Sequence, residues 1–459
     1  MHDGSSRSAA AQQRLALRPV YDASTRRALG AALGAAFLAG RWSEQAMVRR
    51  GARALEPRPR WLRAVVREVL AAYHRPPADR PRELAAYVAL ALEDRRSALP
   101  APRVRRAFGP EAEMARAPWP VPAIRSPGAL AALLGLEIGE LLWLADARGL
   151  ERDAPSRRLR HYDYQWLRRP GAPPRPIAAP KPRLKAVQRW ILHEILDRIP
   201  PHDAAHGFVR GRSAVSHAAQ HARRPTVVRL DLEDFFASVT AARVYGIFRT
   251  AGYPEAVAHT LTALSTTVVP RIEWEALPAP APELARRHSR LGRRLATPHL
   301  PQGAPTSPAL ASLAANGLDR RLATLAPTLL AGYSRYADDL TFSGPADLPA
   351  RTLIRVTAEI ARDEGFSVSP AKTRVRRAHE RQLVCGVVVN AGTNVPRQEY
   401  DRLRALLHDA GRNGAAAANR AGEPEFRAHV LGRISWVAAL HPARGARLLE
   451  RFERVDWDS

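Results

Sequence analysis

Residues 332–343 have the sequence GYSRYADDLTFS. Two short runs rich in aromatic and β-branched residues flank a tight turn that carries two adjacent carboxylates, Asp338 and Asp339. This pattern predicts two antiparallel strands joined by a hairpin, with the acidic pair at its tip. An isolated Asp-Asp pair is more often a turn cap than a chemical site, because Asp readily hydrogen-bonds to its own backbone. The interpretation therefore depends on what else the chain places beside this hairpin.

A second acidic strand is predicted over residues 226–233, TVVRLDLE. Alternation sends Val228 and Leu230 to one face and Asp231 to the other. A carboxylate at the end of a buried strand is costly unless it is solvated, paired or bound to a metal. If the hairpin packs here, three carboxylates converge and repel one another by several kcal/mol at about 4 Å. Two Mg²⁺ ions about 3.5–4 Å apart, or Mn²⁺ in their place, would relieve the repulsion and activate a hydroxyl for phosphoryl transfer.

The composition indicates a nucleic-acid partner. The chain has 459 residues, enough for two or three structural units. Lys and Arg number 71 against 44 Asp and Glu, a net charge of +27. Such an excess repels itself unless an anion neutralises it, and the commonest large anion is nucleic acid. Lysine occurs only at Lys181, Lys185 and Lys372, so arginine supplies most of the charge. A basic surface without a dedicated partner is the alternative.

The single cysteine and the hydropathy pattern predict a cytoplasmic protein. Cys385 alone cannot form an intramolecular disulfide, which fits a reducing compartment. The apolar run 28–40 follows two arginines as a signal sequence would. This run is too short to span a bilayer and ends at Arg41. We therefore expect no membrane segment.

Hydrophobic periodicity divides the chain into three parts. A basic helical extension with a Pro-rich linker is expected over residues 1–127, a region of mixed helices and strands over 128–396, and a helical part over 397–459. In the middle part, a turn-rich strand segment is expected at 162–180, helices at 181–199 and 305–325, and a strand at 382–390. The Pro- and Arg-rich stretch 270–300 is predicted to be a surface insertion.

Three motifs in order resemble reverse transcriptases, and within them bacterial retron-type enzymes. They are LDLEDFF at 230–236, LPQGAPTSP at 300–308 and the YADD hairpin. The resemblance runs from about residue 140 to 457. It implies an α+β right-hand polymerase, with fingers and palm on an antiparallel sheet (128–396), a helical thumb (397–459) and the preceding helical extension. It also implies that Asp231, Asp338 and Asp339 are catalytic metal ligands, with the carbonyl of Leu232 near a metal.

The same resemblance indicates residues that contact the incoming nucleotide. Phe236 matches the aromatic residue under the sugar, where a flat ring leaves no room for a 2′-hydroxyl; simple core packing is the alternative. Arg169 and Arg175 bracket a turn-rich tip that resembles the fingers hairpin, whose basic residues clamp the triphosphate. Taken alone, two such arginines would read as a solvated surface.

Two further segments are expected near the nucleotide. Gln302 and Gly303 open a helix, where Gly permits close backbone approach and the Gln amide can contact a base edge. Lys372 lies in a segment similar to the one that follows the catalytic hairpin in the family. We expect Lys372 to protonate the pyrophosphate leaving group, which an arginine cannot do because it keeps its proton.

Two elements point to the retron type, each with one departure. Retron enzymes carry an Asn-Ala-x-x-His element, and here His217 stands in the Asn position, with His221 matching the His. A zinc site from these histidines is the weaker reading, since no third ligand is near. Val384, Cys385 and Gly386 resemble the retron Val-Thr-Gly element, with Cys in place of Thr. RNA contact is expected at both elements, while Cys385 fits a small buried core residue equally well.

These observations predict an RNA-directed DNA polymerase. The resemblance implies a cognate structured non-coding RNA as template and primer, with dNTPs as substrates. It also implies a branched RNA–DNA product and an RNA–DNA hybrid bound to the enzyme. It further implies anti-phage defence beside a separate effector protein. Two alternatives stay open: another bacterial reverse transcriptase, of a group II intron-like or other defence-associated type, and a catalytically silent polymerase scaffold that binds RNA.

Overall fold

The computed structural model describes residues 21–93, 102–105, 112–154 and 156–457, and the side chain of Arg169 lies outside this set. The chain forms two compact units. One comprises the described residues up to Ala147 together with Phe248–Ala263, and the other comprises Arg148–Ile247 and the chain from Leu264 onward. The first unit thus extends past residue 127, where the helical extension was expected to end. Residues 98–101 and 106–111 of the predicted linker lie outside the described residues.

Helices make up most of the first unit, as the periodicity predicts. They are α2 (Ala23–Leu38), α3 (Glu44–Ala54), α4 (Leu62–Ala72), α5 (Pro81–Ala91), α6 (Pro127–Leu133) and α7 (Ile138–Ala145), with a short antiparallel pair of β1 (Leu55–Glu56) and β2 (Arg103–Val104). Most of α12 (Glu255–Ser265) and the end of α11 (Ala241–Thr250) also belong to this unit.

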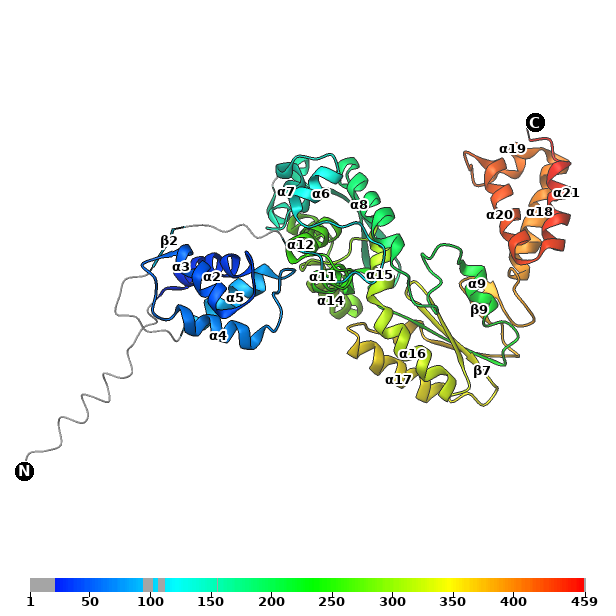
Figure 1. Ribbon diagram of the computed structural model, residues 1–459. Helices are drawn as coiled ribbons and strands as arrows, with labels where there is room; N and C mark the ends of the chain where they lie inside the picture. The colour runs from blue at the N-terminus through cyan, green and yellow to red at the C-terminus, as the bar shows by residue number, and fades with distance from the viewer. Residues whose placement is uncertain (1–20, 94–101, 106–111, 155, 458–459) are drawn as a thin grey trace, which may run out of the picture. The chain divides into compact units, whose positions relative to one another are not determined.

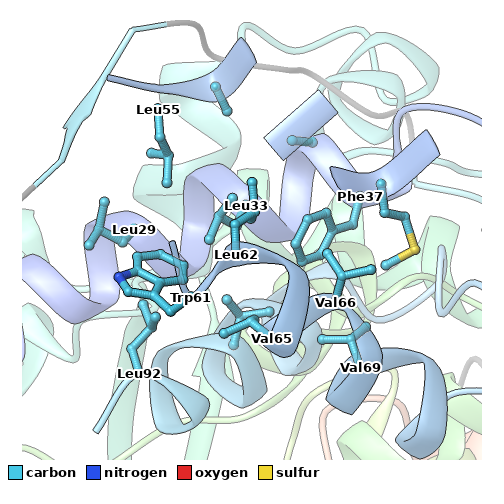
Figure 2. Packing of buried hydrophobic residues seen from close by; sticks show 14 of the residues in the cluster. Leu29, Leu33, Phe37, Leu55, Trp61, Leu62, Val65, Val66, Val69 and Leu92 are labelled. Carbon is cyan, nitrogen blue, oxygen red and sulfur yellow. The ribbon is translucent and has the colours of Figure 1, made fainter. Parts of the chain in front are cut away.

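Close packing of α2 on α5 explains Gly30 and Gly34 of α2, which both approach Ala85. A Cβ at Gly30 would lie 2.4 Å from the carbonyl oxygen of Ala85, so the two backbones approach to a distance that only glycine permits. Figure 2 shows the core beside this crossing, where Leu33, Phe37 and Val66 point toward one another. Burying such side chains stabilises the unit by roughly 1.5–3 kcal/mol each.

No single helix among the described residues is long and apolar enough to cross a membrane. The bent pair α6 and α7 satisfies the length and composition criteria only when its two helices are taken together.

Four antiparallel strands form the central sheet of the second unit. Their order is β6–β7–β5–β8, with β5 at Thr226–Asp231, β6 at Gly332–Tyr336, β7 at Asp339–Gly344 and β8 at Arg374–Arg377. The predicted hairpin is present as β6 and β7, and the predicted upstream strand as β5. The register places Asp231 opposite Asp339. Asp231 and Asp339, more than one hundred residues apart in the sequence, therefore lie side by side at the ends of the two central strands.

A two-stranded hairpin and a set of helices surround this sheet (Figure 1). The hairpin pairs β3 (Tyr162–Arg169) with β4 (Ala172–Pro180). The helices are α8 (Pro182–Glu194), α9 (Ala214–Ala219), α10 (Phe235–Ser238), α13 (Arg271–Glu275), α14 (Ala285–Leu295), α15 (Ser307–Ala314), α16 (Asn316–Thr328) and α17 (Ala350–Asp363), with short 3-10 turns at Leu150–Asp153, Arg157–Leu159, Leu196–Arg198, Pro282–Leu284 and Pro370–Lys372.

The stretch predicted as one strand at 382–390 is a tight hairpin instead. β9 (Leu383–Val384) pairs with β10 (Val387–Val388), and Cys385 and Gly386 form the turn with φ of 48° and 81°. Positive φ at both central residues is the geometry of a type I′ turn, which matches the twist of the two strands. The apolar run alone could not reveal this reversal, because a Val-rich sequence fits a strand on either side of the turn.

Helices make up most of the described chain from Arg397 to Glu453, as predicted. They are α18 (Arg397–Asn413), α19 (Ala415–Ala418), α20 (Phe426–Leu440) and α21 (Pro442–Glu453). Leu407, Ile434 and Leu448 belong to one apolar core that also includes Val384 and Val387 of the β9–β10 hairpin.

A buried ion pair fastens β6 to α16. The Arg335 guanidinium donates to Asp319 at 2.8 and 2.6 Å and to the carbonyl oxygen of Ala337 at 3.0 Å. The Tyr333 hydroxyl donates to the same carboxylate at 2.8 Å. Asp319 is fully buried and Arg335 is 1% exposed. A pair this deep contributes little beyond its desolvation cost, but removing one partner leaves an uncompensated charge in the core.

We therefore expect Asp319→Ala to lower the free energy of unfolding by about 3–5 kcal/mol. Glu359→Ala, which removes an exposed partner of Arg355 on α17, should cost about 1 kcal/mol or less. Urea denaturation followed by tryptophan fluorescence measures both. Equal shifts of the two midpoints would contradict the anchoring role of the buried pair.

Candidate active site

The turn of the β6–β7 hairpin holds the acidic pair against the end of β5. The Leu232 amide donates to the carbonyl oxygen of Asp338 at 2.8 Å, which extends the pairing of β5 with β7 by one residue. Ala337 has a φ of 55°, a conformation that residues with a Cβ seldom adopt and that is concentrated at functional sites. Gly207 lies directly on this turn, since a Cβ there would be 2.4 Å from the Ala337 amide nitrogen. Close packing thus fixes the position of Asp338.

The carboxylates of Asp231 and Asp338 repel each other at the ends of these strands. Burial raises the pKa of Asp338 first, and the charge of Asp231 raises it further. The Lys372 ammonium donates to Asp231 at 2.7 Å and relieves part of the conflict. Both acids are oxygen donors of the kind that hard divalent cations prefer, and their mutual repulsion is what a cation would remove. These two carboxylates therefore fit a divalent metal ion.

Asp339 is held differently from the other two acids. The Arg229 guanidinium binds both of its carboxylate oxygens, one through Nη2 and the other through Nε at 3.3 Å. Burial raises the pKa of Asp339, while this guanidinium opposes the rise. Asp339 does not line the cleft that Asp231 and Asp338 share. The sequence grouped three acids as equal metal ligands; the structure brings two to the cleft and gives the third an arginine partner.

The cleft beside Asp231 and Asp338 has a volume of about 390 Å³. Seven of the residues expected to act in catalysis or nucleotide binding line it: Asp231, Asp338, Leu232, Lys372, Arg175, Phe236 and Gln302. Gly303 is not among the lining residues, but its φ is 123° and a Cβ there would lie 2.9 Å from the Ala178 carbonyl oxygen, which leaves room only for glycine. Arg169 belongs to β3, and its side chain lies outside the described residues.

Phe235 and Phe236 are neighbours at the cleft that differ in burial, with ring centroids 5.8 Å apart. Phe235 is 4% exposed and packs on Phe366 with ring centroids 5.6 Å apart. Phe236 is half-buried at the wall of the cleft, with its ring centroid 6.1 Å from that of Phe208. Both residues line the cleft, and Phe236 is the more exposed of the two.

His217 and His221 lie beneath the catalytic hairpin. His217 is hydrogen-bonded to Ser334 at 2.8 Å and to Thr341 at 3.3 Å. His221 is hydrogen-bonded to Ser334 at 2.7 Å and to Ser343 at 2.8 Å. The two rings are 0% and 1% exposed, so neither is accessible to RNA in this conformation. Their burial opposes the expected RNA contact and gives both histidines a role in supporting the hairpin.

The β9–β10 hairpin is partly accessible. Val384 is buried, Cys385 is half-buried and Gly386 is exposed at the turn. Burial raises the pKa of the Cys385 thiol to about 12, and the charge of Asp339 adds to the rise. The thiol is therefore un-ionised near neutral pH and sits close to the catalytic edge. Gly386 is the member of this element most available to a nucleic-acid strand.

No three His, Cys, Asp or Glu side chains among the described residues gather closely enough to hold a metal ion together. The rings of His217 and His221 are hydrogen-bonded to hydroxyl groups of the hairpin.

Sequence reasoning missed three contributors to the site. Arg229 precedes Asp231 by two residues and so shares its face, a signal that could have paired it with an acid. Gly207 gave no signal, because its contact with Ala337 is made across 130 residues of chain. The third is α14, whose Arg287 and Arg290 line the cleft although this region was predicted to be a surface insertion.

The buried histidines make stability depend on pH. Burial lowers the pKa of His217 to about 2 and that of His221 to about 3, so both are neutral when folded, while the unfolded chain takes up protons below about 6.5. Stability is therefore complete above pH 6.5 and falls as the pH drops below it, by up to about 1.4 kcal/mol per pH unit for each ring. Urea midpoints at pH 7.5, 6.5 and 5.5 measure this slope.

His217→Asn should reduce the slope by about one proton, whereas His408→Asn, at an exposed position of α18, should leave it unchanged. A wild-type midpoint that rises toward pH 5.5 would contradict the assignment of neutral buried rings.

Comparison with known proteins agrees with this geometry. Residues 168–389 match the reverse transcriptase (RNA-dependent DNA polymerase) family. The chain is similar to the retron Mx65 reverse transcriptase of Myxococcus xanthus, at 40% identity over 74% of this chain and 74% of that protein. It is also similar to the retron Mx162 reverse transcriptase of Myxococcus xanthus (38% identity; 72% and 66% of the two chains) and to the retron Ec86 reverse transcriptase of Escherichia coli (28%; 61% and 77%). The chain belongs to the bacterial retron-type reverse transcriptases and is an RNA-directed DNA polymerase.

Proposed function

We propose that this enzyme copies part of a cognate structured non-coding RNA into single-stranded DNA. The RNA serves as template and, through a 2′-hydroxyl, as primer, so that the DNA product stays branched from it. The observation that carries this proposal is the shared cleft in which Asp231 and Asp338 lie with Arg175, Phe236 and Gln302. A defensive role against phage beside a separate effector protein belongs to the same proposal and follows from the retron resemblance.

The fold supports a right-hand layout. In this proposal the β3–β4 hairpin acts as fingers, the four-stranded sheet as palm, and α18 to α21 as thumb. The functional boundaries are then 128–396 for fingers and palm and 397–459 for the thumb, with 1–127 as a basic extension. A net charge of +27 suits a polymerase that covers an RNA template and an RNA–DNA hybrid.

Reverse transcriptases use divalent metal ions, and Asp231 and Asp338 are the side chains that would hold them here. When bound, Mg²⁺ or Mn²⁺ would activate the attacking hydroxyl and stabilise charge on the leaving oxygen. Asp339 contributes through Arg229, which fixes the end of β7 beside β5. Leu232 lines the same cleft, and its carbonyl group would lie near a metal.

The nucleotide is positioned by the remaining lining residues. Arg175 would contact the triphosphate with its guanidinium, a strong charge-assisted interaction. The Phe236 ring would exclude a 2′-hydroxyl. Gln302 would contact the base or sugar from the opposite wall, where its backbone carbonyl oxygen is fixed by the Ala178 amide at 2.8 Å. Lys372, held at Asp231, would donate a proton to the departing pyrophosphate.

Recognition of the cognate RNA would rest on exposed groups. Gly386 at the tip of the β9–β10 hairpin allows close approach of a strand, and Cys385 beside it is half-buried. His217 and His221 would act indirectly, by holding the catalytic hairpin in place.

Asp338→Asn should reduce DNA synthesis to background, because it removes one of the two charges that attract the metal while keeping the side-chain shape. The assay is extension of a DNA primer on an RNA template with Mg²⁺, together with RNA binding, which should not change. Asp347→Asn, at an exposed position after β7, is the matched control and should keep full activity.

In cells that express the gene with its flanking DNA, the wild type should yield RNA-linked small DNA and Asp338→Asn none. Robust extension by Asp338→Asn would refute the metal assignment, and extension without RNA-linked DNA would refute the retron product.

Phe236→Ala should admit ribonucleotides, because it opens space beside C2′ of the sugar. Single-nucleotide incorporation of dNTP and rNTP measures the selectivity ratio, which should fall by about tenfold or more. Phe236→Tyr keeps the ring and should keep the ratio. If the ratio is the same in Phe236→Ala and wild type, another residue must select the sugar.

A further inference from the structure

Helix α14 is an arginine-rich wall of the catalytic cleft. Its sequence, ARRHSRLGRRL, contains five arginines in eleven residues. Leu291 and Leu295 are buried and form a small core with Val269. The His288 ring stacks on Trp274 at 4.4 Å, and a Cβ at Gly292 would lie 2.7 Å from the same indole. This apolar anchor fixes the rotation of the helix, so its charged residues cannot reorient freely.

Because the rotation of α14 about its axis is fixed, its arginines fall into two groups that face different directions. At 100° per residue, positions 287, 290 and 294 form one stripe beside Leu291, and positions 286 and 293 lie farther round the helix. Arg287 and Arg290 line the cleft that contains Asp231 and Asp338. Arg286 and Arg293 are exposed and do not line it. One helix therefore carries cleft-facing and outward-facing arginines.

Two members of the stripe are tied to the segment that follows the catalytic Asp231. Arg290 donates to Glu233 at 2.8 Å. Arg294 donates to Asp234 at 3.0 Å and to the carbonyl oxygen of Glu233 at 3.2 Å. These contacts hold α14 against the turn that leads into Phe236.

Arg287 differs from its neighbours. It is half-exposed at the cleft wall, and it has no carboxylate partner in the part of the chain that the structure describes. An arginine held in a cleft of catalytic acids without an acid of its own is suited to an anionic ligand. Its planar fork can bond two phosphate oxygens at once.

We propose that Arg287 and Arg290 bind the triphosphate of the incoming nucleotide, opposite Arg175. The inference rests on the proposed function and adds a second basic wall to that site. Arg287 supplies an unengaged guanidinium. Arg290 is kept at the cleft by Glu233 and shares its remaining N–H groups with the phosphates. Arg294 is a positioning residue, because it donates to Asp234, to the Glu233 carbonyl oxygen and to the Ser367 hydroxyl.

The triphosphate fits this wall better than a nucleic-acid strand does. The cleft of about 390 Å³ lies within the range of small-molecule sites, about 300–1,000 Å³, whereas a strand needs an open groove. The same cleft holds Asp231, Asp338 and Phe236, so a ligand there has its reacting phosphate beside the acids and its sugar beside the ring.

Single-nucleotide incorporation on an RNA template–DNA primer tests the proposal. Arg287→Ala should raise the KM for dNTP by about tenfold or more, the effect of losing one hydrogen bond to a charged group, with a smaller change in kcat. Arg290→Ala should also raise the KM. The Kd for template–primer should stay within about twofold of wild type. Arg287→Lys should restore part of the loss, because a point charge replaces the fork.

Arg286→Ala and Arg293→Ala are the matched controls, since they remove the same charge from the same helix. Both should leave the KM for dNTP unchanged. An equal rise in all four alanine variants would overturn the proposal in favour of a general charge effect. An unchanged KM with weaker template–primer binding in Arg287→Ala would overturn it in favour of a strand contact.

A second measurement does not depend on turnover. With a dideoxy-terminated primer, the next complementary dNTP should slow dissociation of the enzyme–template–primer complex, and Arg287→Ala should need about tenfold more dNTP for the same effect. If wild type forms this complex but never extends a primer, the proposed function fails while the triphosphate site stands. If Arg287→Ala and wild type need the same dNTP concentration, the triphosphate site is refuted whatever the polymerase activity.

Discussion

The antiparallel register of β5 with β7 is the constraint on which the site depends. It places Asp231 opposite Asp339 and brings the Asp338 turn to the end of β5. A shift of one residue would send every side chain of the strand to the other face and separate the acids. Buried polar contacts hold this register. The Asp319–Arg335 ion pair fixes β6 to α16, and His221 links Ser334 of β6 to Ser343 of β7.

Electrostatic conflict and its partial relief organise the cleft. Burial and the neighbouring charge raise the pKa of Asp338, while Lys372 pairs with Asp231 and Arg229 with Asp339. The two basic partners differ in where they lie. Lys372 lines the cleft, whereas Asp339 is bound by Arg229 and is not among the residues that line the cleft. Adjacent acids in the sequence thus have different partners.

The basic walls of the cleft come from segments that are far apart in the chain. Arg175 belongs to the β3–β4 hairpin and Arg287 to α14, more than one hundred residues later. Trp166 of β3 and Trp274 of α13 are tilted against each other at 5.9 Å and pack against the small core of Val269, Leu291 and Leu295. This apolar core joins the hairpin to α14 and so helps to fix the charged groups that face the cleft.

Motif order and periodicity were enough to predict the polymerase family, strand β5, the β6–β7 hairpin and seven of the residues that line the cleft, because they are local properties of the chain. The resemblance also selected Phe236, which lines the cleft beside the more deeply buried Phe235. Tertiary structure decided what depends on distant partners. It buried His217 and His221 under the hairpin, gave Asp339 to Arg229, reversed the chain at Cys385 and turned a presumed insertion into the α14 wall. A side chain's type is written in the sequence, but its burial and its partner are set by segments that pack against it from elsewhere in the fold.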